Sequence, residues 1–127
     1  MSISTIIVNY NAGETLQRCV NALRKSERHT SITLVDNASS DRSTENLRNL
    51  YGDHQGIEFL FNPDNIGFGP AVNAVARRLD TDWILILNPD CILEADTLGH
   101  LTAALVNGFL HQPCLPCRIK YSFIKKK

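Results

Sequence analysis

The chain has 127 residues, of which 43% are apolar and 20% charged, and these values exclude a disordered chain and are typical of one folded domain. Lysine plus arginine equals aspartate plus glutamate at 13 each, which excludes a broadly basic nucleic-acid-binding protein. Residues 1–9 are too short and uncharged for a signal peptide, and no apolar run approaches the roughly 20 residues of a membrane span. With four cysteines and no leader, we expect a cytoplasmic domain with reduced thiols.

The first half of the chain alternates strand and helix patterns. Residues 3–9 and 32–36 are short β-branched runs, which are typical of strands buried on both faces. Between them, residues 14–28 repeat apolar side chains at helical spacing. A second helix is predicted after the N-cap residue Asp41, with Leu50 among its inward-facing residues.

The same alternation continues in the second half. Residues 57–61 and 83–87 predict a third and a fourth strand. Pro70 suits the first position of the helix between them, and a last helix opens at Glu94 or Asp96. The order βαβαβαβα predicts the α/β class, with a Rossmann-like parallel sheet, right-handed crossovers and helices on both faces.

The composition changes near Gly108. Residues 1–108 contain 13 acidic and 8 basic residues, whereas residues 109–127 contain no acid and five bases. We therefore predict a folded domain over 1–108 and an irregular basic tail over 109–127.

Polar segments follow all four predicted strands. They are residues 9–11, 36–41, 62–69 and 88–90. The carboxyl ends of parallel strands meet at one edge of a sheet, and ligands bind outside that edge. Turn formation alone would explain any one of these segments, but four at the same edge favour a binding site.

The residues at this edge favour a nucleoside diphosphate held with a divalent cation. Asp36 and Asp90 make the edge acidic, and Mg²⁺ or Mn²⁺ would bridge such carboxylates to phosphates. A turn over residues 67–69 leads into a helix and offers backbone N–H groups to an anion. Tyr10 offers a ring on which a flat base could pack.

Four strings at this edge together resemble the family 2 glycosyltransferases. They are IIVNYN at 6–11, VDNASSD at 35–41, NIGFGPAVN at 65–73 and ILNPD at 86–90. Each string alone is weak, but the set comes in family order and covers residues 3 to about 106. Within the family the chain is most similar to bacterial rhamnosyltransferases, whose donor is dTDP-rhamnose.

The resemblance implies a GT-A fold and an inverting transfer of a sugar from a nucleotide donor to a hydroxyl acceptor. It further implies O-antigen or lipopolysaccharide synthesis, with a membrane-associated, lipid-linked acceptor at the inner face of the cell membrane. The partner would be a nucleoside-diphosphate sugar and not a nucleic acid.

The resemblance also implies a set of donor-binding residues. The set is Val8, Asn9, Tyr10, Asp36, Asn65, Gly67, Asn88 and Asp90. The first three would line the nucleobase pocket, and Asp36 would contact the base or the ribose. The next two would lie near the ribose or the sugar of the donor.

The last two members of this set take the place of the family's Asp-x-Asp motif. Asp90 is therefore the expected metal and diphosphate residue. Asn88 replaces the first carboxylate and removes one negative charge, so we expect Mg²⁺ or Mn²⁺ to bind weakly.

The resemblance ends about one helix after Asp90. The second half of the family's domain supplies the acceptor site and the catalytic base, usually Asp or Glu, and residues 109–127 contain no carboxylate. We therefore assign no catalytic residue and expect a truncated, inactive donor-binding half. The alternative without catalysis is a residual nucleotide-binding fragment or one part of a split protein.

Two other functions match short motifs. Residues 67–72 half-match a dinucleotide fingerprint and leave an NAD-binding Rossmann domain as a remote alternative, although the turn follows the third strand and its third small position is Val72. Cys114 and Cys117 mimic a redox Cys-x-x-Cys, and His111 adds a third zinc ligand. The redox motif lacks a preceding strand, and zinc lacks a fourth ligand.

Overall fold

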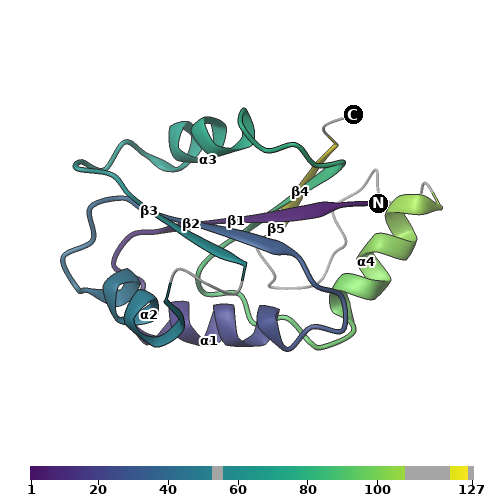
Figure 1. Ribbon diagram of the computed structural model, residues 1–127, viewed down its shortest axis with the longest axis horizontal. Helices are drawn as coiled ribbons and strands as arrows, with labels where there is room; N and C mark the ends of the chain where they lie inside the picture. The colour runs from purple at the N-terminus through teal and green to yellow at the C-terminus, as the bar shows by residue number, and fades with distance from the viewer. Residues whose placement is uncertain (53–55, 108–120, 126–127) are drawn as a thin grey trace.

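The computed structural model describes residues 1–52, 56–107 and 121–125. Strands and helices alternate along the chain up to the last strand (Figure 1). The elements are β1 (Ile3–Asn9), α1 (Glu14–Arg24), β2 (Ser31–Asp36), α2 (Ser43–Tyr51), β3 (Ile57–Phe61), α3 (Phe68–Ala76), β4 (Trp83–Leu87), α4 (Thr97–Val106) and β5 (Tyr121–Lys125). No helix in these ranges is both long and apolar enough to cross a lipid bilayer.

The strands form one sheet in the order β3-β2-β1-β4-β5. The first four run parallel, which confirms the predicted α/β class. β5 runs antiparallel to β4, with Leu87 opposite Tyr121 and Trp83 opposite Lys125. The prediction of an irregular tail is therefore wrong for residues 121–125. This segment, YSFIK, is rich in strand-forming residues, and it pairs with the edge that β4 offers.

Helices cover both faces of the sheet, as predicted (Figure 1). Side chains of α1, α2 and α4 join one buried apolar cluster, and we call this side the three-helix face. Side chains of α3 join a second cluster on the other side, the α3 face. Alternate residues of β1 divide between them, because successive strand side chains point to opposite faces. Ile3 and Ile7 lie on the three-helix face, whereas Ile6 and Val8 lie on the α3 face.

α1 ends four residues before its predicted end. The helix stops at Arg24, and the chain then turns toward the loop before α4. The Ser26 hydroxyl and the Glu27 N–H both donate to the carbonyl of Ala95, at 3.2 and 2.9 Å. These contacts replace the bonds that would have continued the helix to Arg28.

The ends of two other helices also differ from prediction. α2 begins at Ser43, two residues after the predicted N-cap Asp41, and Leu50 is 57% exposed, because Tyr51 takes the inward position one turn after Leu47. α3 begins at Phe68, so Pro70 is its third residue and not its first. Proline is tolerated there because no N–H in the first turn has a partner within the helix.

Candidate functional site

A cavity of about 520 Å³ opens at the carboxyl ends of β1 and β4. Both strands contribute, together with the loop before α3, so the cavity lies at the edge where ligands of parallel sheets bind. Its lining residues are Val8, Tyr10, Ala12, Thr15, Asn37, Asn65, Gly67, Phe68, Asn88, Pro89 and Asp90.

A larger cavity of about 660 Å³ opens at the opposite edge of the sheet. It is lined by residues at or just before the beginnings of the strands, among them Ser4, Ser31 and Thr81, and by Arg28. It contains none of the predicted site residues. The smaller cavity is the better candidate, because parallel sheets bind ligands at their carboxyl edge.

The smaller cavity brings together six of the eight predicted donor-binding residues. They are Val8, Tyr10, Asn65, Gly67, Asn88 and Asp90. Asn9 and Asp36 do not line it, because their side chains lie on the three-helix face, where Asn9 contacts the start of α2. Val8 and Tyr10 follow the opposite parity along β1 and reach the α3 face.

The carboxylate of Asp36 is occupied by the protein itself. Asp36 is 5% exposed, and its Oδ1 accepts from Thr44 Oγ1 at 2.6 Å and from Asn9 Nδ2 at 3.2 Å. Its Oδ2 accepts from the backbone N–H of Ser39 at 2.8 Å. These bonds anchor the end of β2 to the start of α2, so the geometry gives Asp36 an internal partner for each oxygen.

Asn37 also lines the cavity, and it is not among the site residues predicted from the sequence. It is 2% exposed, its Nδ2 donates to the carbonyl of Gly67 at 3.1 Å, and its Oδ1 accepts from Asn62 Nδ2 at 2.8 Å. Asn37 thus joins the ends of β2 and β3 to the turn before α3. Strand alternation could have identified it, since it follows Val35 by two residues and shares the α3 face.

The turn before α3 aims the beginning of that helix at the cavity. Gly67 occupies the position before the helix with a φ of 86°, where a residue with a Cβ would be strained. Its N–H was predicted as a donor to the ligand, but it donates to Asn65 Oδ1 at 3.0 Å. The anion-binding potential of this turn therefore comes from the first residues of α3 and not from Gly67.

A buried thiol contacts the backbone of the loop that bears Asp90. The carbonyl of Asn88 accepts from the Cys91 N–H at 3.0 Å and from Cys19 Sγ at 3.6 Å. Burial, and next the neighbouring Cys91 and Asp90, raise the pKa of Cys19 to about 12. Cys19 is therefore a protonated donor at neutral pH, and it is not among the site residues predicted from the sequence.

The oxygen donors at this loop fit a weakly bound divalent cation. Asp90 is exposed and Asn88 is half-buried, and both line the cavity. Within the part of the chain that the structure describes, no three His, Cys, Asp or Glu side chains gather into a metal site. One carboxylate with diphosphate oxygens is a donor set that Mg²⁺ or Mn²⁺ accepts, whereas a site made by the protein alone would need more ligands.

Comparison with known proteins identifies the family. Glycosyl transferase family 2 matches residues 4–119, which is most of the chain and extends past Gly108. The chain belongs to glycosyl transferase family 2. The turn at 67–69 follows β3, whereas the fingerprint of a dinucleotide-binding domain follows its first strand. Residues 67–72 therefore do not occupy the position of that fingerprint. Cys114, Cys117 and His111 lie outside the described residues.

One relative and two solved structures are similar to this chain. An uncharacterized glycosyltransferase of Haemophilus influenzae is 30% identical over 97 residues, which are 76% of this chain and 39% of the relative. Residues 1–349 of S. aureus TarS, in complex with UDP-GlcNAc, superpose with a TM-score of 0.75 at 17% identity, over 92% of this chain and 37% of that TarS chain. Mannosyltransferase PcManGT from Pyrobaculum calidifontis, in complex with GDP-Man and Mn²⁺, gives a TM-score of 0.72 at 19% identity, over 87% of this chain and 32% of that one.

These likenesses show that the sheet and its helices have the GT-A fold. The chain spans about two fifths or less of the length of each of these three proteins.

Proposed function

We propose that this chain forms the donor-binding part of an inverting glycosyltransferase, which takes a sugar from a nucleoside diphosphate and passes it to a hydroxyl acceptor. The observation that carries the proposal is the cavity at the carboxyl ends of β1 and β4, where Tyr10, Asn88 and Asp90 meet in a family 2 domain.

Each side of the cavity suits a different part of the donor. Tyr10 is 55% exposed, so its ring is available to pack against a nucleobase. Asp90 and the first turn of α3, which also contribute to the cavity lining, suit the diphosphate. A divalent cation held there by Asp90, with Asn88 beside it, would offset phosphate charge and stabilise the departing nucleoside diphosphate.

For the donor we propose dTDP-rhamnose. Its support is the resemblance of the four strings at 6–11, 35–41, 65–73 and 86–90 to rhamnosyltransferases. The same resemblance supports an acceptor for O-antigen or lipopolysaccharide, lipid-linked and reached from the cytoplasmic face of the membrane. TarS and the mannosyltransferase were solved with UDP-GlcNAc and GDP-Man, which makes UDP and GDP the nucleotides to compare with dTDP.

We propose further that this chain alone does not complete the transfer. Deprotonation of an acceptor hydroxyl needs a positioned base. Among the cavity residues of the described ranges, Asp90 is the one carboxylate, and the metal and diphosphate require it. The donor site therefore supports nucleotide binding, and a base must come from residues that do not line this cavity.

Calorimetry with dTDP, UDP and GDP, each with and without Mn²⁺, tests the proposal. We expect binding that strengthens with Mn²⁺, tightest for dTDP, and an Asp90→Ala variant that binds equally with and without the ion. Asp64→Ala is the matched control, because Asp64 is exposed and does not line the cavity. Metal-independent binding by the wild-type chain would remove Asp90 from its role, and no binding of any nucleotide would overturn the proposal.

A further inference from the structure

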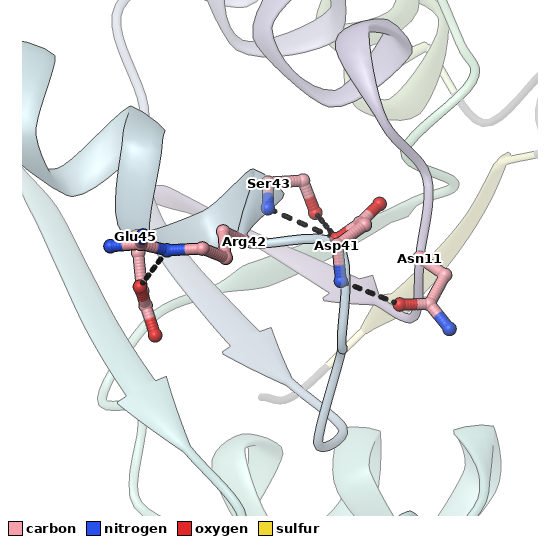
Figure 2. A network of polar contacts seen from close by, with 5 residues as sticks. All are labelled: Asn11, Asp41, Arg42, Ser43 and Glu45. Atoms are coloured by element: carbon pink, nitrogen blue, oxygen red, sulfur yellow. Dashed lines mark hydrogen bonds and ion pairs between the residues drawn. The ribbon is translucent and has the colours of Figure 1, made fainter.

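Two loops at the edge of the cavity exchange hydrogen bonds in both directions. One loop joins β1 to α1, and the other joins β2 to α2. The Oδ1 of Asn11 accepts from the backbone N–H groups of Ser40 and Asp41, at 2.8 and 3.2 Å, and Figure 2 shows the second of these bonds. In return, the Asn11 N–H donates to Ser39 Oγ at 3.0 Å and the Gly13 N–H donates to Asp41 Oδ2 at 2.9 Å. We call these five residues, Asn11, Gly13, Ser39, Ser40 and Asp41, the loop clasp.

The backbone of the β1–α1 loop is held by side chains. Three successive N–H groups, those of Asn11, Ala12 and Gly13, donate to Ser39 Oγ, Asn9 Oδ1 and Asp41 Oδ2. Asn11 also has a left-handed backbone with a φ of 52°, a conformation that asparagine tolerates better than most residues. The path of this loop therefore depends on acceptors supplied mainly by the β2–α2 loop.

Asp41 is the central acceptor of the loop clasp. Figure 2 shows its Oδ1 accepting from the N–H of Ser43 at 3.0 Å and from the Ser43 hydroxyl at 2.7 Å. Partial burial raises the pKa of Asp41, but the hydrogen bonds from Ser43 and Gly13 outweigh it, so the pKa lies below its ordinary value. Asp41 is therefore a charged acceptor at neutral pH, joined to both the start of α2 and the β1–α1 loop.

The loop that is held in this way carries one side of the cavity. Tyr10, Ala12 and Thr15 line it, and the Thr15 hydroxyl donates to the Ala12 carbonyl at 2.6 Å. Neither Asn11 nor Asp41 lines the cavity, so they act on it only through the loop. The loop with Asn88 and Asp90, which also lines the cavity, is anchored separately by the contacts to the Asn88 carbonyl.

We propose that the loop clasp positions the nucleobase side of the donor cavity, with Asp41 and Asn11 as positioning residues. The proposal rests on the proposed function and deepens it. Loss of the loop clasp lets the loop bearing Tyr10 move away from the base, while the diphosphate side keeps its own anchors. The two ends of the donor therefore respond differently to the same substitution.

Two variants of the full chain test this difference. Asn11→Gly keeps the left-handed backbone accessible and removes the acceptor, and Asp41→Ala removes the central carboxylate. Glu45→Ala is the control, since Glu45 pairs with Arg42 beside the clasp (Figure 2) and does not line the cavity. Asp41→Asn keeps one acceptor oxygen and should recover part of what Asp41→Ala loses.

The probes are the nucleoside diphosphates dTDP, UDP and GDP, and inorganic pyrophosphate, each titrated with Mn²⁺ below the unfolding temperature of every variant. We expect Asn11→Gly and Asp41→Ala to weaken binding of the preferred nucleoside diphosphate roughly 10-fold or more, as expected for lost hydrogen bonds, with pyrophosphate affinity unchanged. Equal losses for both probes would indicate general loosening and overturn the proposal, and so would unchanged nucleotide affinity in both variants. If the wild-type chain binds none of the three nucleotides, the proposed function fails first and the role of the loop clasp with it.

Discussion

At the scale of single residues, the buried amide and carboxylate at the ends of β1 and β2 hold the cavity in place without lining it. Asn9 is fully buried, its Nδ2 donates to Asp36 and to the Ser43 and Thr44 hydroxyls, and its Oδ1 accepts from Ala12. Removing one member leaves the others without partners in a buried site, which costs more than the bond itself.

We therefore expect Asp36→Ala to lower the free energy of unfolding by about 1–3 kcal/mol, because the Thr44 hydroxyl and the Ser39 N–H lose their acceptor and Asn9 loses one of its acceptors. Urea unfolding followed by the fluorescence of Trp83, the only tryptophan, measures the loss. Asp64→Ala, at an exposed position on the same edge, should leave the midpoint unchanged. Equal midpoints for both variants would show that the Asp36 bonds contribute nothing to stability.

The buried thiol under the Asp90 loop predicts a pH dependence of stability. The pKa of Cys19 is raised from 9.0 to about 12, so folding favours the protonated thiol. This contribution is complete below pH 9 and is lost as the pH rises from 9 toward 12. Above pH 9, the wild-type chain should lose about 1 kcal/mol per pH unit relative to Cys19→Ser, which does not ionise there. Urea midpoints at pH 7, 9 and 10 make the comparison, and parallel profiles would contradict it.

A site residue could be predicted where its position after a strand is enough to place it at the cavity. Tyr10 and Asp90 each follow a strand that is recognisable from its apolar run, and both line the cavity. Which face a residue occupies depends on strand parity, and strand position alone did not separate Asn9 from Val8. The hydrogen bonds of the loop clasp could not be predicted from the sequence. They depend on how two loops that lie about 28 residues apart in the chain approach each other in the fold.

At the scale of elements, strand bounds were more predictable than helix ends. The predicted strands 3–9, 57–61 and 83–87 match β1, β3 and β4, because polar or turn-forming residues follow each run, such as Asn62 and Pro63 after β3 and Asn88 after β4. The end of α1 depends instead on the Ala95 carbonyl, about 70 residues away in sequence. β5 was missed because a run of only five residues is a weak strand signal, and its pairing depends on the open edge of β4.

Because β5 pairs with β4, we expect substitutions in residues 121–125 to change the free energy of unfolding. Ser122 lies opposite Ile86 in the antiparallel pair, and a proline at position 122 removes one N–H from the strand. We expect Ser122→Pro to lower the free energy of unfolding by about 1–3 kcal/mol. Ser122→Ala keeps the N–H and should be neutral. Identical urea midpoints for these two variants would mean that β5 adds no stability to the sheet.

At the scale of the whole molecule, the proposed donor cavity lies in a chain that spans about two fifths or less of each of the three similar proteins. Joined to the remainder of the Haemophilus influenzae relative, of which the present chain spans 39%, residues 1–107 should transfer sugar, because the donor side would meet a base. Release of nucleoside diphosphate in the presence of acceptor measures it. The same fusion with Asp90→Ala should be inactive. Sugar transfer by the 127-residue chain alone would contradict the proposal that its base lies elsewhere.

The central place of β1 has a consequence for how the chain is made. β1 pairs with β2 on one side and with β4 on the other, and Ser2 bonds to Asp82, 80 residues later. During synthesis β2 emerges soon after β1, whereas β4, which covers the other edge of β1, emerges only after α1, β2, α2, β3 and α3. Until β4 arrives, this unpaired edge can pair with another nascent chain, so the risk of aggregation persists until β4 has been made.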